Sequence, residues 1–424
     1  MILAIAAFWY GFVPVIGAFF VRRDWRYFRQ RFEELRLRPL LDYAAYRRGG
    51  EGEYRFIGGF ESVTDGHTLW IKGAELTVPV ALTGAQTYVL PIPPDSDSAA
   101  GAAGPSPGGK GASGRPAAGK AVHESFDPGK EAPQRIEWEQ LTSLTEGARV
   151  FVGGDLVLMN NRLAFASTSE KPLMVIFYDG PDRSLTVRTI RTARQGNEYW
   201  NNWTPYAIAL GAFCQLIVVL LYMQRPVFQL SVIAAFSAML FPLYPLIPPG
   251  LVFTVIYRNL WWRGRVYRAY RDMVRLPLRY FSGKELRGVL PDGEEYAGVS
   301  YRTMGGDLRV KIENGEIPLL IPEKEAGKNP RWYVFGVPAR AGSTAGAGNT
   351  AEPGSAGNAG NDAPPPLPTP PRDVFAPCAA VPGDPERLAR VFNRKAYILE
   401  IVSWTLLLAG IALNAFCIAV IVFS

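Results

Sequence analysis

Hydrophobic residues along this chain are gathered into long runs instead of recurring at the period of an amphipathic helix or strand. A run of about 20 apolar residues is long enough to cross the hydrocarbon core of a bilayer. We therefore predict transmembrane helices over residues 1–21, 203–223 and 396–423. The first run has no Lys or Arg before it, so we interpret it as a retained anchor and not as a cleaved signal.

A further apolar run, 227–257, is interrupted by prolines at positions 242, 245, 248 and 249. Proline removes a backbone donor and kinks or breaks a helix. We predict one transmembrane helix that is broken at these prolines. Two half-spans joined by a re-entrant turn are the alternative, which a bilayer tolerates where other helices shield the free backbone groups.

Arginine accumulates in the segments that follow the first and third apolar runs, 22–48 and 258–282. The positive-inside rule places both segments in the cytoplasm. Four crossings satisfy this rule, with both termini on the far side. We therefore expect a multi-pass protein of a cell membrane, the bacterial inner membrane in particular, with cytoplasmic soluble modules. The formal charge of +7 is concentrated in the two basic segments, so it does not indicate general nucleic-acid affinity.

Both basic segments carry bulky side chains at intervals of three and four residues, which predicts basic amphipathic helices. Such helices could lie at the membrane surface, with rings in the headgroup zone and guanidiniums on anionic lipid headgroups. The residues that would make these contacts are Trp25, Arg26, Arg29, Phe32, Trp262, Arg263, Arg265, Arg268 and Tyr270. The alternative is that these helices extend the spans and pack on the soluble modules.

Residues 50–195 form a soluble segment in which short strands alternate with turns. Three strands, a short helix near 135–147 and two further strands are predicted, and a Gly/Ala/Pro/Ser-rich insertion over 95–132 is expected to be disordered. This order, with "VFVGGDLVLMNNRLAF" as the late hairpin, resembles the OB-fold, a small Greek-key barrel. β modules beside spans also resemble the membrane-adjacent domains of NfeD-like and GIDE-type proteins. The chain has no RING cysteine pattern, so ligase chemistry is not implied.

A second, reduced β module is predicted over 284–338, followed by a disordered linker over 339–372. Its predicted strands are "YAGVSYRT", "LRVKI", "EIPLLI" and "RWYVFGV". With a shift of about 238 residues the early part of the chain aligns with this region. We interpret the fold class as a multi-pass α-helical membrane protein with an internal duplication. Its unit is span, basic helix, β module, flexible tract and span, and the two copies are parallel repeats.

Two buried amides are expected in the closing spans of the repeats. Gln215 follows Gly211 by four residues, and Asn414 follows Gly410 by the same interval. Small residues let helix backbones approach, and amides hydrogen-bond across helices in lipid. We predict that these four residues pack the spans. If the repeats are related by a pseudo-twofold axis, the two amides are expected to bond to each other.

Catalytic or metal-binding chemistry is not indicated by the sequence. His67 and His123 lie apart from any Cys or carboxylate at ligand spacing, so we expect no enzyme, no cofactor and no metal site. We predict a membrane-anchored scaffold or adaptor whose β modules bind a protein partner. A transporter or channel component is the first alternative. A membrane-tethered OB module for nucleic acid is the second and least favoured, since Trp70 beside Lys72 is more typical of strand packing.

Overall fold

The protein is described from a computed structural model. The described residues are 1–64, 67–90, 133–137, 148–159, 161–168, 171–179, 182–192, 198–199, 201–224, 229–280, 287–289, 295–301, 306–313, 317–326, 330–336 and 378–423. They form two compact units, which are treated separately below. The helical unit comprises Met1–Gln30, Ala193–Ala269 and Phe392–Ser424, and the β-rich unit comprises Arg31–Thr192 and Tyr270–Val391. The predicted insertion 95–132 and the linker 339–372 lie outside the described residues.

Long apolar helices dominate the helical unit. They are α1 (Ile2–Ala6), the π-helical η1 (Ala7–Phe12), α2 (Val13–Leu35), α7 (Trp203–Met223), α8 (Gln229–Leu240), the 3-10 segment η3 (Phe241–Leu246), α9 (Gly250–Tyr280) and α11 (Pro385–Phe423). Among the described residues, three stretches are long and apolar enough to cross a membrane: Ile2–Leu35, Trp203–Met223 and Pro385–Ile418. A membrane protein is therefore compatible with the fold.

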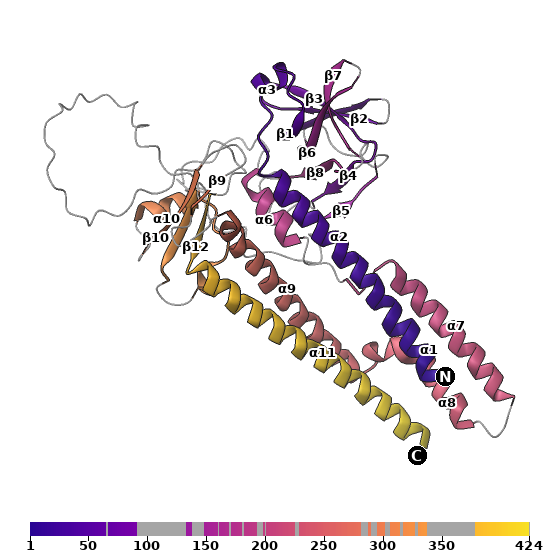
Figure 1. Cartoon of the computed structure of the whole chain (residues 1–424). Helices are drawn as coiled ribbons and strands as arrows, with labels where there is room; N and C mark the ends of the chain where they lie inside the picture. The colour runs from indigo at the N-terminus through magenta and orange to yellow at the C-terminus, as the bar shows by residue number, and fades with distance from the viewer. Residues whose placement is uncertain are drawn as a thin grey trace, which may run out of the picture. The chain divides into compact units, whose positions relative to one another are not determined.

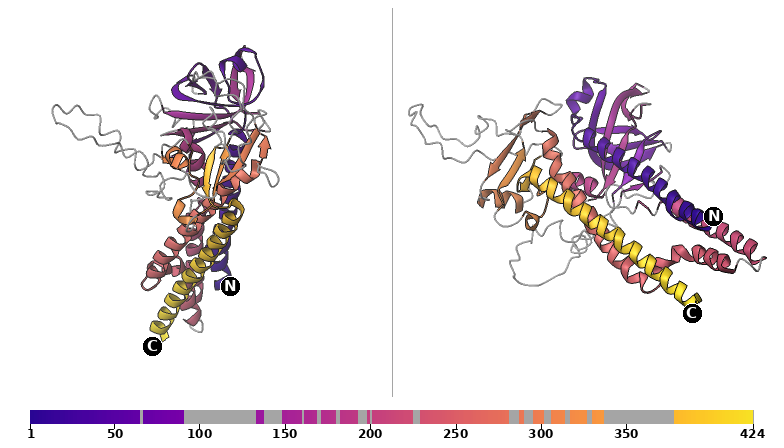
Figure 2. Two further views of the ribbon diagram at one scale, coloured as in Figure 1. Left: turned by 90° about the vertical axis from the view of Figure 1, so that its left-hand side faces the viewer. Right: turned by 60° about the horizontal axis from the view of Figure 1, so that its bottom comes forward.

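The proline-interrupted run forms a bent pair of helices. Leu230–Leu246 and Gly250–Arg279 together satisfy the length and hydropathy of a span, and they meet at an angle of 56°. The break lies between η3, which has Pro245 inside it, and α9. This is the position that the prolines predicted. Within the helical unit, the N-terminal helices lie against α7 and α8, and α9 lies beside α11 (Figures 1 and 2).

Five strands of the β-rich unit close into a barrel. β1 (Gly52–Thr64), β2 (Thr68–Lys72), β3 (Thr77–Ala81), β7 (Arg162–Ala166) and β6 (Arg149–Met159) pair in that order, and β6 returns to β1. All these pairings are antiparallel except β3 with β7. The prediction of a small closed barrel in this region is confirmed, and it has the size of the small Greek-key barrels.

Alternating apolar residues fill the barrel. Leu69 and Ile71 of β2 and Val78 and Val80 of β3 are fully buried, and in β2 the buried residues alternate with more exposed ones, as the period of two predicts. The helix α3 (Tyr43–Arg47) packs on this core through Tyr46, and Asp42 caps its N-terminus. Beyond β6 the sheet continues through β8 (Met174–Tyr178), β4 (Gln86–Val89) and β5 (Gln134–Arg135).

The helix predicted near 135–147 differs at its start, because Arg135 belongs to β5, where it pairs with Tyr88. Residues 138–147 of that prediction lie outside the described residues. A helix that the sequence did not predict, α6 (Asp182–Thr192), follows β8. Asp182 lies in its first turn and accepts a hydrogen bond of 2.8 Å from the Tyr178 hydroxyl.

A second sheet contains β9 (Arg287–Val289), β10 (Glu295–Tyr301), β11 (Trp332–Gly336) and β12 (Ala379–Pro382). Several features differ from the prediction. The described residues of "EIPLLI", predicted as a strand, make only an isolated bridge, between Leu319 and Ala380. The segment "LRVKI", predicted as a strand, lies in the helix α10 (Gly306–Glu313), whose Leu308 packs on Trp332 and Val334. The fourth strand, β12, comes from beyond the predicted module. A 3-10 turn, η4 (Glu323–Glu325), precedes β11.

Candidate functional site in the helical unit

In the first helix pair, α7 packs closely on the N-terminal helices. A Cβ added to Gly211 would lie 2.5 Å from Cε1 of Tyr10 and 2.8 Å from Cβ of Trp9, so only glycine allows this approach. One turn further along α7, the fully buried Gln215 donates a hydrogen bond of 2.9 Å from Nε2 to the backbone carbonyl of Ile2. The glycine therefore brings the helices close enough for the amide to reach a backbone acceptor.

The second helix pair has the same kind of contact. A Cβ added to Gly410 of α11 would lie 2.7 Å from Cβ of Phe253 in α9. One turn later, Nδ2 of Asn414 donates to the carbonyl oxygens of Tyr244 at 2.6 Å and Ile247 at 2.8 Å. These two carbonyls lie at the helix break, where the regular backbone hydrogen bonds of the helix are interrupted. Asn414 thus satisfies backbone groups that the break releases.

A third contact completes each pair, at the opposite end from the amide. Asn201, just before α7, lies against Gly17, and Glu400 of α11 lies against Gly264. In each closing segment the three contact residues are spaced ten and then four positions apart, as 201, 211 and 215, and as 400, 410 and 414. The four residues predicted to pack the spans therefore all lie in contacts between helical segments: Gly211, Gln215, Gly410 and Asn414. The predicted bond between the two amides is wrong, because each amide bonds to a carbonyl of its own helix pair.

A buried carboxylate holds two arginines of the helical unit together. Glu198 is ion-paired with Arg22 of α2 and accepts a hydrogen bond of 2.9 Å from Nη2 of Arg265 in α9. Arg22 also donates to the hydroxyl of Tyr199 at 2.9 Å. The carboxylate and Arg265 are both largely buried. A buried pair of this kind is costly to break, because removing one partner leaves an uncompensated charge.

Four aromatic rings surround this ion cluster. Tyr199 and Trp404 meet edge to face at 5.2 Å between ring centroids, and Trp261 packs on Tyr257 and Trp404 at 6.0 Å each. The guanidinium of Arg265 lies 4.5 Å from the centroid of Trp261, within cation–π range. The rings contact one another, so they form a packed cluster rather than an open cage for a ligand cation.

A second ion pair joins α9 and α11. Nε and Nη2 of Arg268 both donate to the carboxylate of Glu400. The ammonium of Lys395 lies 5.0 Å from the centroid of Tyr267, which itself stacks on Phe392 at 5.9 Å. Glu400 is therefore held in an ion pair within the helical unit. A bidentate arginine–carboxylate contact fixes the orientation of both side chains.

The residues predicted for the membrane surface separate into three groups by their exposure. Phe32, Tyr270 and Arg265 are buried within the protein, so the surface prediction is wrong for them. Phe32 packs on Phe151 of the barrel at 5.5 Å between ring centroids. Arg26, Trp262 and Arg263 are exposed, whereas Trp25, Arg29 and Arg268 are half-buried. Both α2 and α9 run as single helices through the predicted boundary between span and basic helix. For the buried residues this supports the packing alternative.

The β-rich unit contains a separate charged cluster around Glu53. Its Oε1 accepts 2.7 Å from Nη1 of Arg31, and its Oε2 lies 2.6 Å from Nη2 of Arg38 and 3.7 Å from the ammonium of Lys171. Burial acts to raise the pKa of Glu53, but the hydrogen bond from Arg31 and the three positive charges outweigh it. The pKa of Glu53 is therefore held below its ordinary value.

Sequence reasoning missed the two carboxylates at the centres of these clusters, Glu198 and Glu53. Each lies at a distance in sequence from the arginines that it pairs with. The only available signal was the excess of arginine after the first and third spans, which needs acidic partners wherever it becomes buried. That signal does not say which acids are used.

Metal ligands are not grouped in the part of the chain that the structure describes: no three His, Cys, Asp or Glu side chains could hold an ion there. His67 lies in the turn before β2. Comparison with protein-family models, with curated protein sequences and with solved structures gives no match to this chain. The function is therefore argued from the geometry alone.

Proposed function

We propose that this chain is a multi-pass membrane anchor that presents a small closed barrel to a protein partner in the cytoplasm. One observation carries the proposal: three polar side chains within the spans join helical segments of the same chain. Gln215 and Asn414 bond backbone carbonyls, and Thr254 donates to the carbonyl of Pro245 at 2.8 Å. This is the arrangement of a fixed bundle, which suits an anchor.

A transporter normally uses such groups differently. In transporters with broken helices, the carbonyls at the break coordinate the ion or substrate. Here the carbonyls of Tyr244, Pro245 and Ile247 each accept a hydrogen bond from a side chain of the chain itself. A solute would have to compete with these bonds. The transporter alternative predicts that Ile247→Cys, which lies at the break, is labelled by a membrane-impermeant thiol reagent in cells, whereas an anchor leaves it unlabelled.

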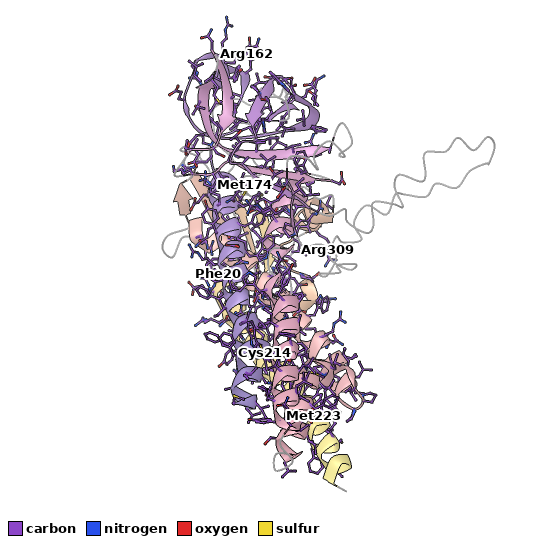
Figure 3. The ribbon with its side chains drawn as sticks, turned by 90° about the vertical axis from the view of Figure 1, so that its right-hand side faces the viewer. Phe20, Arg162, Met174, Cys214, Met223 and Arg309 are labelled. Carbon is purple, nitrogen blue, oxygen red and sulfur yellow. The ribbon has the colours of Figure 1, made fainter. Side chains whose placement is uncertain are left out.

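Partner binding is proposed for the outer end of the β6–β7 hairpin. Leu158 and Met159 at the end of β6 are 57% and 42% exposed, whereas Leu156 of the same strand is fully buried. Arg162 follows the turn and is also exposed (Figure 3). Exposed apolar side chains beside an arginine are typical of the centre of a protein interface. Oligonucleotide binding to this barrel remains the less favoured proposal.

A photo-crosslinking residue in place of Met159 tests partner binding in cells. We expect one discrete adduct that is lost when Leu158→Asp is added, because a charge at the centre of an apolar interface is costly. The same crosslinker at Lys72, which is exposed elsewhere on the barrel, is the matched control and should give no such adduct. Equal labelling at both positions would contradict a specific interface.

The proposed topology has four crossings, with the β modules in the cytoplasm. A bend of 56° supports one broken crossing, because a re-entrant hairpin would turn the chain back on itself. The arginines that follow the first and third spans support the orientation. Reporters inserted near Gly108 and Gly354 should therefore report the cytoplasm, and a fusion after Ser424 the far side. A cytoplasmic signal after Ser424 would contradict this topology, because it would require one crossing more or one fewer than four.

We also propose that the two helix pairs descend from one duplicated unit. The support is the repeated set of contacts at equal spacing, in which a polar residue, a glycine and an amide of the closing span meet the opening span. The soluble parts differ more, since the aligned residues Leu69 and Leu308 lie in a strand and in a helix. The helical parts support parallel repeats better than the β modules do.

Anionic lipid headgroups remain proposed ligands of the exposed residues of the two basic segments, Arg26, Trp262 and Arg263 among them. Each basic residue near an anionic surface contributes about 1 kcal/mol of attraction, and salt screens it. A peptide of residues 22–48 should therefore gain helicity on anionic vesicles and lose it in high salt. Equal helicity on neutral vesicles would leave only the packing explanation.

A further inference from the structure

Arginines on three helices of the helical unit lie at one height along the bundle. Glu198 is ion-paired with Arg22 of α2 and with Arg265 of α9, which places these two positions level with each other. The backbone carbonyl oxygen of Ala396 in α11 would lie 3.5 Å from a Cβ added to Gly264, the residue before Arg265, so α11 reaches the same height there. Segments that are far apart in the sequence therefore meet at one level of the bundle.

Four exposed arginines surround this level, and together we call them the arginine belt: Arg23 and Arg26 of α2, Arg263 of α9 and Arg394 of α11. Each lies within four residues of the contact that fixes the level on its own helix, which is at most about 6 Å along the helix axis. The belt is therefore about 10 Å deep. This depth is close to that of one headgroup layer, since the two headgroup layers of a bilayer add about 10–15 Å to its hydrocarbon core.

The acids of the helical unit do not neutralise the belt. The three segments of this unit contain twelve Lys or Arg but three acidic residues. Glu198 and Glu400 are already held in ion pairs with arginines outside the belt, and Asp24 is the remaining acid of the unit. The next acids along α2, α9 and α11 lie at least seven residues beyond the nearest belt arginine, about 10 Å along the axis. That distance exceeds the screening length of about 8 Å at physiological ionic strength.

Uncharged apolar helix adjoins the belt. Residues 2–21 of the first helices and residues 401–423 of α11 contain no charged side chain. These stretches are about 30 and 34 Å long, which matches a hydrocarbon core of about 30 Å. Trp262 and Tyr397, which neighbour the belt in sequence, are 37% and 60% exposed, and such rings are typical of the membrane–water interface. In a bilayer that covers these stretches, the belt lies at the level of the phospholipid phosphates.

We propose that the arginine belt binds the phosphate groups of anionic phospholipids through three helices of the folded bundle. The proposal rests on the membrane placement proposed above and deepens it, because it gives a lipid-binding role to Arg394 of α11 and requires the helices to be assembled. A guanidinium donates two parallel N–H groups to phosphate oxygens. A zwitterionic headgroup carries a cation beside its phosphate, which the belt repels, so phospholipids with a net negative headgroup are selected.

Native mass spectrometry of the full-length protein in detergent micelles measures the dissociation constants of individually bound phospholipids. We expect phosphatidylglycerol to bind at least about fivefold more tightly than phosphatidylcholine with the same acyl chains. The difference should shrink as the ammonium acetate concentration is raised, because salt screens exposed charges. Equal dissociation constants for the two lipids would overturn the proposal.

Arg394→Gln is the decisive variant, because α11 joins the belt only in the folded bundle. It should weaken phosphatidylglycerol binding about fivefold, which is the contribution of one arginine near an anionic surface, and leave phosphatidylcholine binding unchanged. Arg394→Lys keeps the charge and should lose less. Arg47→Gln removes an exposed arginine of α3 and is the matched control. Unchanged phosphatidylglycerol binding in Arg394→Gln, or an equal loss in Arg47→Gln, would overturn the three-helix site.

The reporter fusions described above test the crossings independently of the lipid measurement. Loss of lipid selectivity together with the expected reporter pattern overturns the belt alone. A preference for phosphatidylglycerol together with a different reporter pattern supports the belt and overturns the proposed topology.

Discussion

Replacing Gly410 by alanine is expected to separate α11 from α9. The new Cβ would lie 2.7 Å from Cβ of Phe253, whereas carbon atoms pack at about 3.5–4.0 Å. The Cβ of Phe253 is fixed to its backbone, so the helices must move apart by about 1 Å. Overpacking of this size costs about 1–3 kcal/mol.

The same movement should also disturb Asn414. Its two hydrogen bonds are 2.6 and 2.8 Å long, and a shift of about 1 Å takes them beyond bonding distance. Such bonds contribute about 0.6–2 kcal/mol in lipid. Alanine regains up to about 1 kcal/mol of helix propensity over glycine. We therefore expect the free energy of unfolding to fall by about 2–3 kcal/mol.

Gly11 is the matched control, because a Cβ added there has no atom within 4 Å. The measurement is reversible unfolding of the full-length protein in mixed micelles with increasing denaturing detergent. Gly11→Ala should unfold like the unmodified protein or slightly later. The double variant of Gly410→Ala and Asn414→Leu should lose less than the sum of the single variants, because both remove the same bonds.

Two results would refute this reasoning. If Gly410→Ala unfolds at the same concentration of denaturing detergent as Gly11→Ala, the backbones of α9 and α11 do not approach at this glycine. If Gly410→Ala is destabilised but its effect adds fully to that of Asn414→Leu, the glycine does not act by bringing the amide into reach.

Three further predictions test the polar contacts. Asn414→Leu leaves two carbonyls at the helix break without a donor and should cost about 2–4 kcal/mol in the same unfolding assay, against a smaller loss for Asn414→Gln if the longer amide still reaches them. Glu53→Gln leaves the buried Arg31 without its carboxylate and should cost about 3–5 kcal/mol near neutral pH. Because the folded pKa of Glu53 lies below the ordinary value of 4.5, its stabilisation is full above that pH and is lost as pH falls through the folded pKa. Unfolding measured against pH should show this acid loss in the unmodified protein and not in the variant. A double-mutant cycle on Glu198→Gln and Arg265→Gln should give a coupling free energy of about 1–3 kcal/mol. This coupling should change little with salt, because both groups are largely buried. A coupling near zero would show that the pair is not formed.

The sequence by itself determined the long apolar helices and the closed barrel. Both rest on local patterns: long apolar runs favour helices that are long enough to cross a bilayer, and alternation in β2 allows one buried face. The glycine-to-amide spacing before Gln215 and Asn414 also indicated close helix packing correctly, because a helix places residues four apart on one face.

Tertiary structure decided which groups meet. The sequence could not choose between an amide partner and a carbonyl partner for Asn414, because the acceptors appear only where the distant η3 breaks the helix. It could not assign Glu198 to Arg265 or Glu53 to Arg31, because ion pairing depends on which side chains become buried together. The segment "LRVKI" has apolar residues that fit a strand or a short helix equally, and packing of Leu308 on Trp332 settled it as a helix. Local pattern determines the element, whereas the partner of a polar group is determined by burial, which is a property of the whole fold.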